Sequence, residues 1–219
     1  MRTWKRCTFA SLILVLVACG IGNAQTTTPP EESKEFLSAR PGFYFGAAGT
    51  GTELTLDLDD ASFFEGLGFE VAPEGSGGEL FLGWAFGRGL ALETLFTNTL
   101  HETGRQDIDA NLIRVQLNAI APILRSGRIQ PYLTGGIGGS ALYFNGPGIV
   151  DTFVSGTMIN LGVGVDLHLM PHLALTTAYR YEVFNFKEKT VETPDLSTTV
   201  DFRGTATANV WTLGLAFSF

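Results

Sequence analysis

The chain has 219 residues, of which 45% are apolar and only 16% are charged, against about a quarter charged in an ordinary soluble domain. No apolar run after residue 24 approaches the ~18 residues that a membrane-spanning helix needs, so a helical membrane protein is excluded. The two cysteines, Cys7 and Cys19, lie near the N-terminus. A chain cleaved beyond them has no disulfide, no Cys-ligated zinc and no thiol nucleophile.

The first 24 residues predict a secretory signal peptide. A basic start with Arg2, Lys5 and Arg6 precedes an apolar centre over 9–17. The small residues at 22–24 (Gly-Asn-Ala) then supply a cleavage site, which completes the three-part layout of a secreted chain.

A lipoprotein leader is the alternative. Residues 16–19 (Leu-Val-Ala-Cys) resemble the lipoprotein processing site, and cleavage there would leave a lipidated Cys19 at the new N-terminus. The two cleavage sites lie in the same stretch of the leader, and only the four-residue motif distinguishes the lipoprotein interpretation. We therefore favour cleavage after Ala24.

Removal of the leader makes the chain more acidic. The leader holds three basic and no acidic residues, so its loss lowers the formal net charge from −8 to −11. Nucleic-acid binding needs a basic footprint, and this charge argues against it. Residues 25–40 lack a hydrophobic period and predict a flexible tail.

From residue 41 onward the dominant hydrophobic period is two, which predicts β-strands. The clearest case is 211–219, where one face is apolar and the other is small or polar. The same alternation runs through 159–169 and 173–183. Five further segments fit less cleanly, at about 42–56, 78–86, 90–97, 110–121 and 129–144.

The connections between these segments alternate in length. Short turns are predicted at 87–89, 122–128 and 170–172, a medium connection at 145–152, and long loops at 57–76, 98–109 and 185–205. In a soluble sandwich, the alternative fold, the polar faces would be solvated. Here they are rich in Gly, Ala, Ser and Thr and poor in Lys and Glu, as in a narrow lumen. The pattern therefore predicts an all-β protein, an eight-stranded antiparallel up-and-down transmembrane β-barrel over 41–219, with strands of about 9–11 residues.

Four segments carry a resemblance to a known family. Three are 41–46 (Pro-Gly-Phe-Tyr-Phe-Gly), 130–138 (Gln-Pro-Tyr-Leu-Thr-Gly-Gly-Ile-Gly) and 179–181 (Tyr-Arg-Tyr). The fourth is the C-terminal strand with its alternate apolar positions Trp211, Leu213, Leu215, Phe217 and Phe219. Together they resemble the small outer-membrane β-barrels of the OmpA/OmpX type, and the last resembles the assembly signal of that family. The likeness covers about 41–219 and is specific for the fold rather than for an activity.

The resemblance implies an integral protein of the outer membrane of a Gram-negative-type cell. It implies periplasmic termini, with 25–40 as a periplasmic tail, and long loops outside the cell. The partners that it implies are outer-membrane lipid and lipopolysaccharide, the barrel-assembly machinery and periplasmic chaperones, with the barrel itself a monomer. OmpA continues into a peptidoglycan-binding domain, and we expect none here.

The inward faces of the predicted strands carry charges, which are costly in a narrow barrel unless they are paired. The polar residues predicted to form a lumen network are Glu93, Arg114, Gln116, Asn118, Asp166, Arg180 and Glu182. Counting antiparallel register from the turn centres places Arg180 opposite Gly162. The same count places Arg114 opposite Gly136, and Glu93 across from Arg114.

Two functions are open for such a lumen. A polar core that plugs the barrel is favoured, because eight strands enclose only enough space for side chains. The alternative is a constriction that gates a narrow porin-like channel for ions or small solutes.

The predicted 57–76 loop is acidic, and it offers two weaker candidates. Its segment 57–60 (Asp-Leu-Asp-Asp) resembles part of a calcium loop, but the glycine and the downstream glutamate of an EF-hand are missing. Solvated charge is therefore expected, and no metal site. The apolar residues within 63–69 are a candidate contact surface for an extracellular partner, and folding onto the barrel rim is the alternative.

Catalysis is the third class, because some small barrels modify lipids near their outer rim. His168 and His172 are predicted at the opposite end, which leaves only His101 with Glu102 in the 98–109 loop. No His-x-Ser pairing of the deacylase type is present. The sequence therefore predicts no catalytic residue and no cofactor, and a structural or surface-interaction role.

Overall fold

A computed structural model of the chain describes residues 42–58, 71–86, 89–104, 108–124, 127–146, 149–193 and 196–219. The eight strands are β1 (Gly42–Leu58), β2 (Val71–Ala85), β3 (Ala91–Thr103), β4 (Asp109–Pro122), β5 (Ile129–Gly146), β6 (Ile149–Met170), β7 (Leu173–Thr193) and β8 (Leu196–Ser218). The predicted signal peptide, the alternative lipoprotein site and the tail at 25–40 lie outside the described residues. Within the described ranges, no helix is long and apolar enough to cross a membrane.

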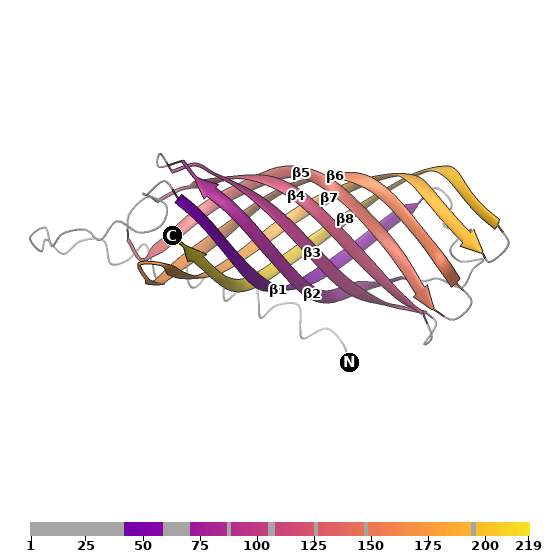
Figure 1. The fold of residues 1–219 in the computed structure, drawn as a ribbon, viewed down its shortest axis with the longest axis horizontal. Helices are drawn as coiled ribbons and strands as arrows, with labels where there is room; N and C mark the ends of the chain where they lie inside the picture. The colour runs from indigo at the N-terminus through magenta and orange to yellow at the C-terminus, as the bar shows by residue number, and fades with distance from the viewer. Residues whose placement is uncertain are drawn as a thin grey trace, which may run out of the picture. The chain divides into compact units, whose positions relative to one another are not determined.

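The eight strands close into one barrel in which every strand is antiparallel to both neighbours (Figure 1). Closure is made by β1, which pairs with β2 on one side and with β8 on the other. Followed across the strands from Phe45, the ladder of paired residues returns to β1 at Thr55, ten residues further along. This stagger tilts the strands against the barrel axis. The predicted eight-stranded up-and-down barrel is confirmed.

The two ends of the barrel differ. At one end, which we call the turn end, lie the connections 86–90, 123–128 and 171–172 together with the C-terminal Phe219 (Figure 1). At the other end, the distal end, lie the connections that follow β1, β3, β5 and β7.

The strands are longer than predicted, with 13 residues in β3 and 23 in β8. The distal connections are correspondingly shorter, so the predicted bounds 57–76, 98–109, 145–152 and 185–205 are wrong. Between β7 and β8, for example, only 194–195 remain as a connection. The physical reason is a reversal of the apolar alternation, which in the sequence looks like the end of a strand.

The reversal is clear along β7. Up to Glu182, the apolar side chains face outward and the charged side chains face the lumen. From Phe184 onward, phenylalanines face the lumen and polar side chains such as Asn185 face outward. The strand β4 reverses in the same way between Arg114 and Leu112. The barrel therefore has a membrane section near the turn end, with an apolar outer wall, and a distal section, with an apolar interior and a polar outer wall.

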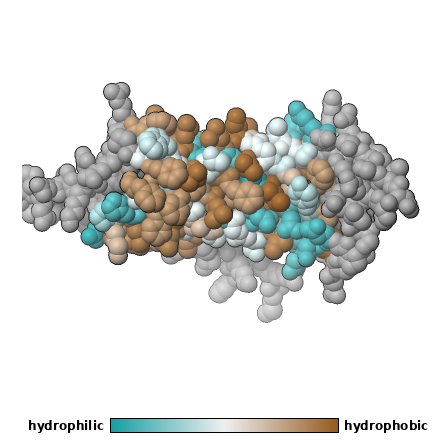
Figure 2. Space-filling view, in the orientation of Figure 1, coloured by the Kyte–Doolittle hydropathy of each residue, from teal (hydrophilic) through white to brown (hydrophobic). Residues whose placement is uncertain are grey.

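The outer wall of the membrane section is a belt of large apolar side chains. All eight strands contribute exposed residues to it. Figure 2 shows them as brown side chains over the part of the barrel nearer the turn end, with paler and teal residues toward the distal end. A closed barrel with such a belt leaves no unpaired backbone in the lipid, which is what spanning a bilayer requires.

The closed ladder predicts a heat-modifiable protein. A closed barrel has no edge strand at which unfolding can begin, so the unheated barrel should stay folded in SDS and migrate faster in a gel than the boiled chain. Identical mobility before and after boiling, for protein extracted from outer membranes, would contradict the closed barrel.

Candidate functional site in the barrel lumen

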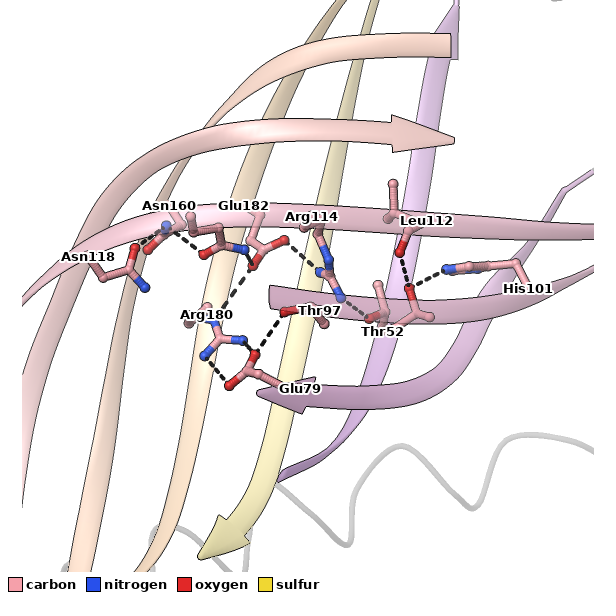
Figure 3. Close-up of polar contacts among 12 residues, drawn as sticks. Thr52, Glu79, Thr97, His101, Leu112, Arg114, Asn118, Asn160, Arg180 and Glu182 are labelled. Carbon is pink, nitrogen blue, oxygen red and sulfur yellow. Dashed lines mark hydrogen bonds and ion pairs between the residues drawn. The ribbon is translucent and has the colours of Figure 1, made fainter. Parts of the chain in front are cut away.

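The lumen of the membrane section holds a connected set of ion pairs and amides (Figure 3). We call it the lumen network, and its members are Thr52, Glu79, Thr97, Arg114, Gln116, Asn118, Asn160, Arg180 and Glu182. They come from β1, β2, β3, β4, β6 and β7, and none exposes more than 7% of its surface. The network thus joins side chains from around the barrel in one buried layer.

Glu182 is the centre of the lumen network. Its Oε2 accepts a hydrogen bond from Arg114 Nη1 at 2.7 Å, and its Oε1 accepts one from Gln116 Nε2 at 2.9 Å. Arg180 Nε lies 3.6 Å from the same Oε1, so one carboxylate faces two guanidinium groups. Arg114 Nη2 also donates to Thr52 Oγ1 at 3.3 Å. Charge-assisted bonds of this kind are about twice as strong as neutral ones.

A second ion pair joins Arg180 on β7 to Glu79 on β2, two strands that are not neighbours in the barrel. Arg180 Nη1 donates to Glu79 Oε1 at 3.2 Å, and Nη2 contacts Oε2. Thr97 Oγ1 donates to the same Oε2 at 3.1 Å. The network therefore balances two carboxylates against two arginines, which lowers the cost of burying each charge.

Amide side chains extend the network toward the turn end. Asn160 Nδ2 donates to Gln116 Oε1 at 2.9 Å and to Asn118 Oδ1 at 2.8 Å. Gly136 lies directly opposite Asn118, and a Cβ at Gly136 would overlap the Asn118 amide oxygen. The glycine makes room for the amide.

The predicted register is correct between β6 and β7, where Arg180 lies opposite Gly162. It is wrong between β4 and β5, where Arg114 lies opposite Ser140. The ladder there is centred on Gly127, two residues beyond the middle of the predicted turn. Gly127 has a φ of +105°, a conformation that glycine adopts at little cost, and it moves the turn toward β5.

The predicted pair of Glu93 and Arg114 is also wrong. Arg114 lies opposite Thr97, and Glu93 lies opposite Asn118, nearer the turn end. The strand β3 continues to Thr103 and β4 begins only at Asp109, so the turn between them lies later than the middle of the predicted loop. Arg114 instead finds its carboxylate on β7.

A cavity of about 90 Å³ lies between the lumen network and the turn end. Its polar lining residues are Tyr44, Glu79, Glu93, Tyr132, Asp166, Thr176, Arg180 and Thr212. Two predicted network residues, Glu93 and Asp166, therefore lie here, while Glu79 and Arg180 close the cavity on its distal side. The rest of the lining is apolar and includes Phe81 and Ile120. A cavity of this size has room for a few water molecules beside its polar groups.

Two tyrosines pack over glycines beside this cavity. Tyr44 on β1 lies opposite Gly83 on β2, and Tyr132 on β5 lies opposite Gly164 on β6. A Cβ on either glycine would overlap the ring of its partner. The Tyr132 hydroxyl then reaches Thr176 Oγ1 at 3.3 Å on the next strand. The glycines thus allow the rings to cross a neighbouring strand.

Replacing these glycines should destabilise the barrel. Gly83→Ala and Gly164→Ala should each lower the free energy of unfolding by roughly 1–3 kcal/mol, because the added methyl displaces a packed ring. Urea unfolding of the refolded barrel in lipid vesicles measures the loss. Gly51→Ala is the matched control, because a Cβ there meets no atom within 4 Å. Equal losses in all three variants would show that the rings do not depend on the glycines.

The interior of the distal section is mainly apolar, with the buried His101 and Thr99 beside an apolar cluster. We call its buried cluster the distal core, formed by Leu54, Ile108, Ala110, Leu112, Leu142, Phe144, Val154, Met158, Phe184, Phe186, Ala206, Ala208 and Val210. Each exposes 3% or less of its surface, and the Phe184 and Phe186 rings stack with centroids 5.9 Å apart. The expected polar filling is therefore wrong for this section. Its outer wall is polar, and burial of apolar side chains inside stabilises it as in a soluble protein.

His101 and Glu102 lie in β3 and not in a loop, which corrects the predicted bounds. His101 points inward and is 1% exposed, with Nδ1 3.1 Å from the Ala72 carbonyl oxygen and Nε2 3.4 Å from Thr99 Oγ1. Glu102 faces outward. In the part of the chain that the structure describes, no group of three or more His, Cys, Asp or Glu side chains is placed to hold a metal ion.

The predicted partner surface at 57–76 falls largely on residues that the structure does not describe. Asp57 and Leu58 belong to β1, and 71–76 belong to β2. The intervening 59–70, which include the apolar residues within 63–69, lie outside the described residues.

The predicted assembly signal lies in β8 except for Phe219, which follows the last strand residue, and its apolar residues face outward at the seam with β1. The rings of Phe217 and Phe219 stack on Phe45 with centroids 5.8 and 5.9 Å apart. The Phe219 N–H donates to the Phe43 carbonyl oxygen at 3.1 Å. These contacts hold the seam at the turn end.

Sequence reasoning does not identify Glu79, Tyr44 or Tyr132 as lumen residues. The signal for Glu79 is present, because Leu80 and Leu82 face the lipid and strand alternation then turns Glu79 inward. No signal in the sequence indicates that Glu79 would meet Arg180, because the two residues lie on strands that are not paired.

Taken together, a closed barrel with an apolar belt and a packed polar lumen defines an integral outer-membrane protein. A family model for the outer membrane protein beta-barrel domain matches residues 11–219, and the chain belongs to this family. It is therefore an integral barrel of the Gram-negative outer membrane, as predicted.

Solved structures show the same fold at low sequence identity. Neisserial surface protein A is 17% identical with a TM-score of 0.58, over 81% of this chain and 97% of that protein. A major outer membrane protein from Thermus thermophilus is 14% identical with a TM-score of 0.52, over 80% and 99%. OprG from Pseudomonas aeruginosa is 15% identical with a TM-score of 0.51, over 86% and 99%. None of the curated proteins matches the sequence.

Proposed function

We propose that this protein is a closed outer-membrane barrel with a structural or surface-interaction role, and that it does not conduct solutes. The observation that carries the proposal is the filling of the lumen. The lumen network occupies the membrane section with side chains that are at most 7% exposed, and the distal core fills the section beyond it. A narrow porin-like channel would need a path past both layers.

The distal section supports a role at the cell surface. Its outer wall carries carboxylates on neighbouring strands. Glu53 lies opposite Glu74 in the strand register, and Glu102 lies opposite Asp109. In the orientation that the family resemblance implies, this section stands outside the bilayer as rigid β-structure. We therefore assign the surface that a partner or neighbouring lipopolysaccharide meets to the distal section and to the connections at its end.

A non-enzymatic role fits the surroundings of the one candidate base. His101 lies inside the distal section, and its ring contacts Thr99 and the Ala72 carbonyl. At 1% exposure, the ring is out of reach of a lipid in the outer leaflet. A general base must come within hydrogen-bond reach of the group it activates.

A deletion strain separates a structural or surface role from transport. The proposal expects unchanged uptake of small solutes, together with greater sensitivity to detergents or weaker surface attachment. Complementation with the wild-type chain should restore those envelope properties. Slower solute uptake in the deletion strain, restored by the wild-type chain, would contradict the proposal.

A further inference from the structure

We infer that the lumen is closed twice, by two seals in series that are each sufficient to stop ions. The first seal is the lumen network and the second is the distal core. The inference rests on the proposed function, because both require a closed lumen. It goes further by assigning the closure to particular side chains in two chemically different layers.

The first seal is electrostatic and crosses the barrel in several directions. Arg114 on β4 bonds Glu182 on β7, and Arg180 on β7 bonds Glu79 on β2. Figure 3 shows these contacts running between strands from different parts of the wall. Each charge already has its partner, so an entering ion would have to replace a buried ion pair, at a cost of several kcal/mol.

The second seal is apolar and lies beyond the first along the same strands. On β4, Leu112 of the distal core is the next inward-facing residue beyond Arg114 toward the distal end. On β7, Phe184 is likewise the next inward-facing residue beyond Glu182. The core also receives Leu54 from β1 and Phe144 from β5. The side chains of the distal core carry no oxygen or nitrogen atom, and the buried His101 and Thr99 beside them contact each other and the carbonyl oxygens of Ala72 and Leu112. Replacing the hydration shell of an ion is therefore unfavourable here, and apolar constrictions exclude ions by dewetting.

The cavity near the turn end lies next to the first seal, on the side away from the distal core. Glu93 and Asp166 line it and are partly exposed, whereas Arg180 and Glu79 at its distal side are about 4% exposed. The cavity therefore ends at the first seal, where Arg180 and Glu79 close it. Breaking the first seal alone would extend this cavity and leave the distal core in place.

Conductance of refolded barrels in planar bilayers tests the two seals. Arg114→Ala/Glu182→Ala opens the lumen network, Phe184→Ala/Phe186→Ala opens the distal core, and a fourfold variant opens both. We expect no channels from the wild type or from either double variant, and steady unitary currents from the fourfold variant. Phe45→Ala/Phe217→Ala, combined with the network variant, is the matched control, because it removes two lipid-facing rings and should stay silent.

Folding of every variant is checked by the gel shift on heating. If the fourfold variant does not fold, cysteine labelling decides the question in the leader-free barrel, which contains no other cysteine under cleavage after Ala24. A water-soluble thiol reagent should label Thr176→Cys, which lines the cavity. It should label Ala206→Cys, which lies opposite Phe184 in the distal core, neither in the wild-type background nor in the network variant.

Each outcome decides one of the two claims. Channels from the wild type contradict the proposed function. A silent wild type with channels from either double variant overturns the double seal and leaves the proposed function intact. A folded but silent fourfold variant, or labelling of Ala206→Cys in the network variant, also overturns the double seal.

Discussion

Replacing Glu182 with alanine should lower the free energy of unfolding by about 3–5 kcal/mol, the usual cost of removing one partner from a buried ion pair. Glu182 accepts hydrogen bonds from Arg114 and Gln116 and lies 3.6 Å from Arg180. Its loss leaves Arg114 with a buried positive charge and only the Thr52 hydroxyl as a partner. Equilibrium unfolding in urea, with the barrel in lipid vesicles, measures the effect.

Glu93→Ala is the matched control for Glu182→Ala, because it removes the same type of side chain but from the cavity at the turn end. It should cost less, since Glu93 is partly exposed beside the cavity, is hydrogen-bonded to the Tyr44 side chain, and makes no ion pair within 4 Å among the described residues. The losses from Arg114→Ala and Glu182→Ala should not add in the double variant, because each removes the partner of the other. Additive losses, or equal losses at Glu93 and Glu182, would contradict the central position of Glu182.

Deleting Phe219 should reduce membrane insertion in cells far more than it reduces refolding in detergent. The resemblance of the terminal strand to an assembly signal predicts that Phe219 is recognised by the barrel-assembly machinery, which detergent refolding does not use. The alternative is that Phe219 only supplies lipid-facing aromatic contact at the seam, where its ring lies 6.4 Å from Phe43 and 5.9 Å from Phe45. Outer-membrane fractionation measures insertion, and the gel shift measures refolding.

Phe43→Ala separates these two roles. It removes one of the two rings that Phe219 contacts across the seam, the other being Phe45, and leaves the C-terminal residue in place. Under the assembly-signal interpretation, Phe43→Ala inserts in cells nearly as well as the wild type. Equal insertion defects for Phe43→Ala and the Phe219 deletion, matched by equal defects in detergent, would favour the seam interpretation.

The fold is readable from the sequence because strand alternation is a local property. The lipid-facing Leu213, Leu215 and Phe217 show which alternate residues of β8 face the lipid and which face the lumen. The same reasoning turns Arg114 and Arg180 inward. Assigning a side chain to one face of its strand needs no knowledge of the neighbouring strand. The inward direction of these side chains therefore follows from their own segments.

Strand bounds and ion pairs are not local, and here the sequence is insufficient. The change from Glu182 to Phe184 on the inward face of β7 reads as a loss of pattern, but it is the passage of one strand from the membrane section to the distal section. Register depends on turn geometry, and the positive φ of Gly127 moves one ladder by enough to bring Ser140 opposite Arg114. The partner of Arg180 across the lumen depends on the closed barrel as a whole, and neither periodicity nor turn position specifies it.

The central claim is that the lumen is closed, and single-channel recording of the refolded wild-type barrel in a planar bilayer tests it most directly. The lumen network and the distal core together predict a silent bilayer at every voltage that the membrane withstands, from protein whose gel shift shows that it has folded and whose insertion is shown by its flotation with lipid vesicles. Steady unitary currents from that same protein would contradict the account.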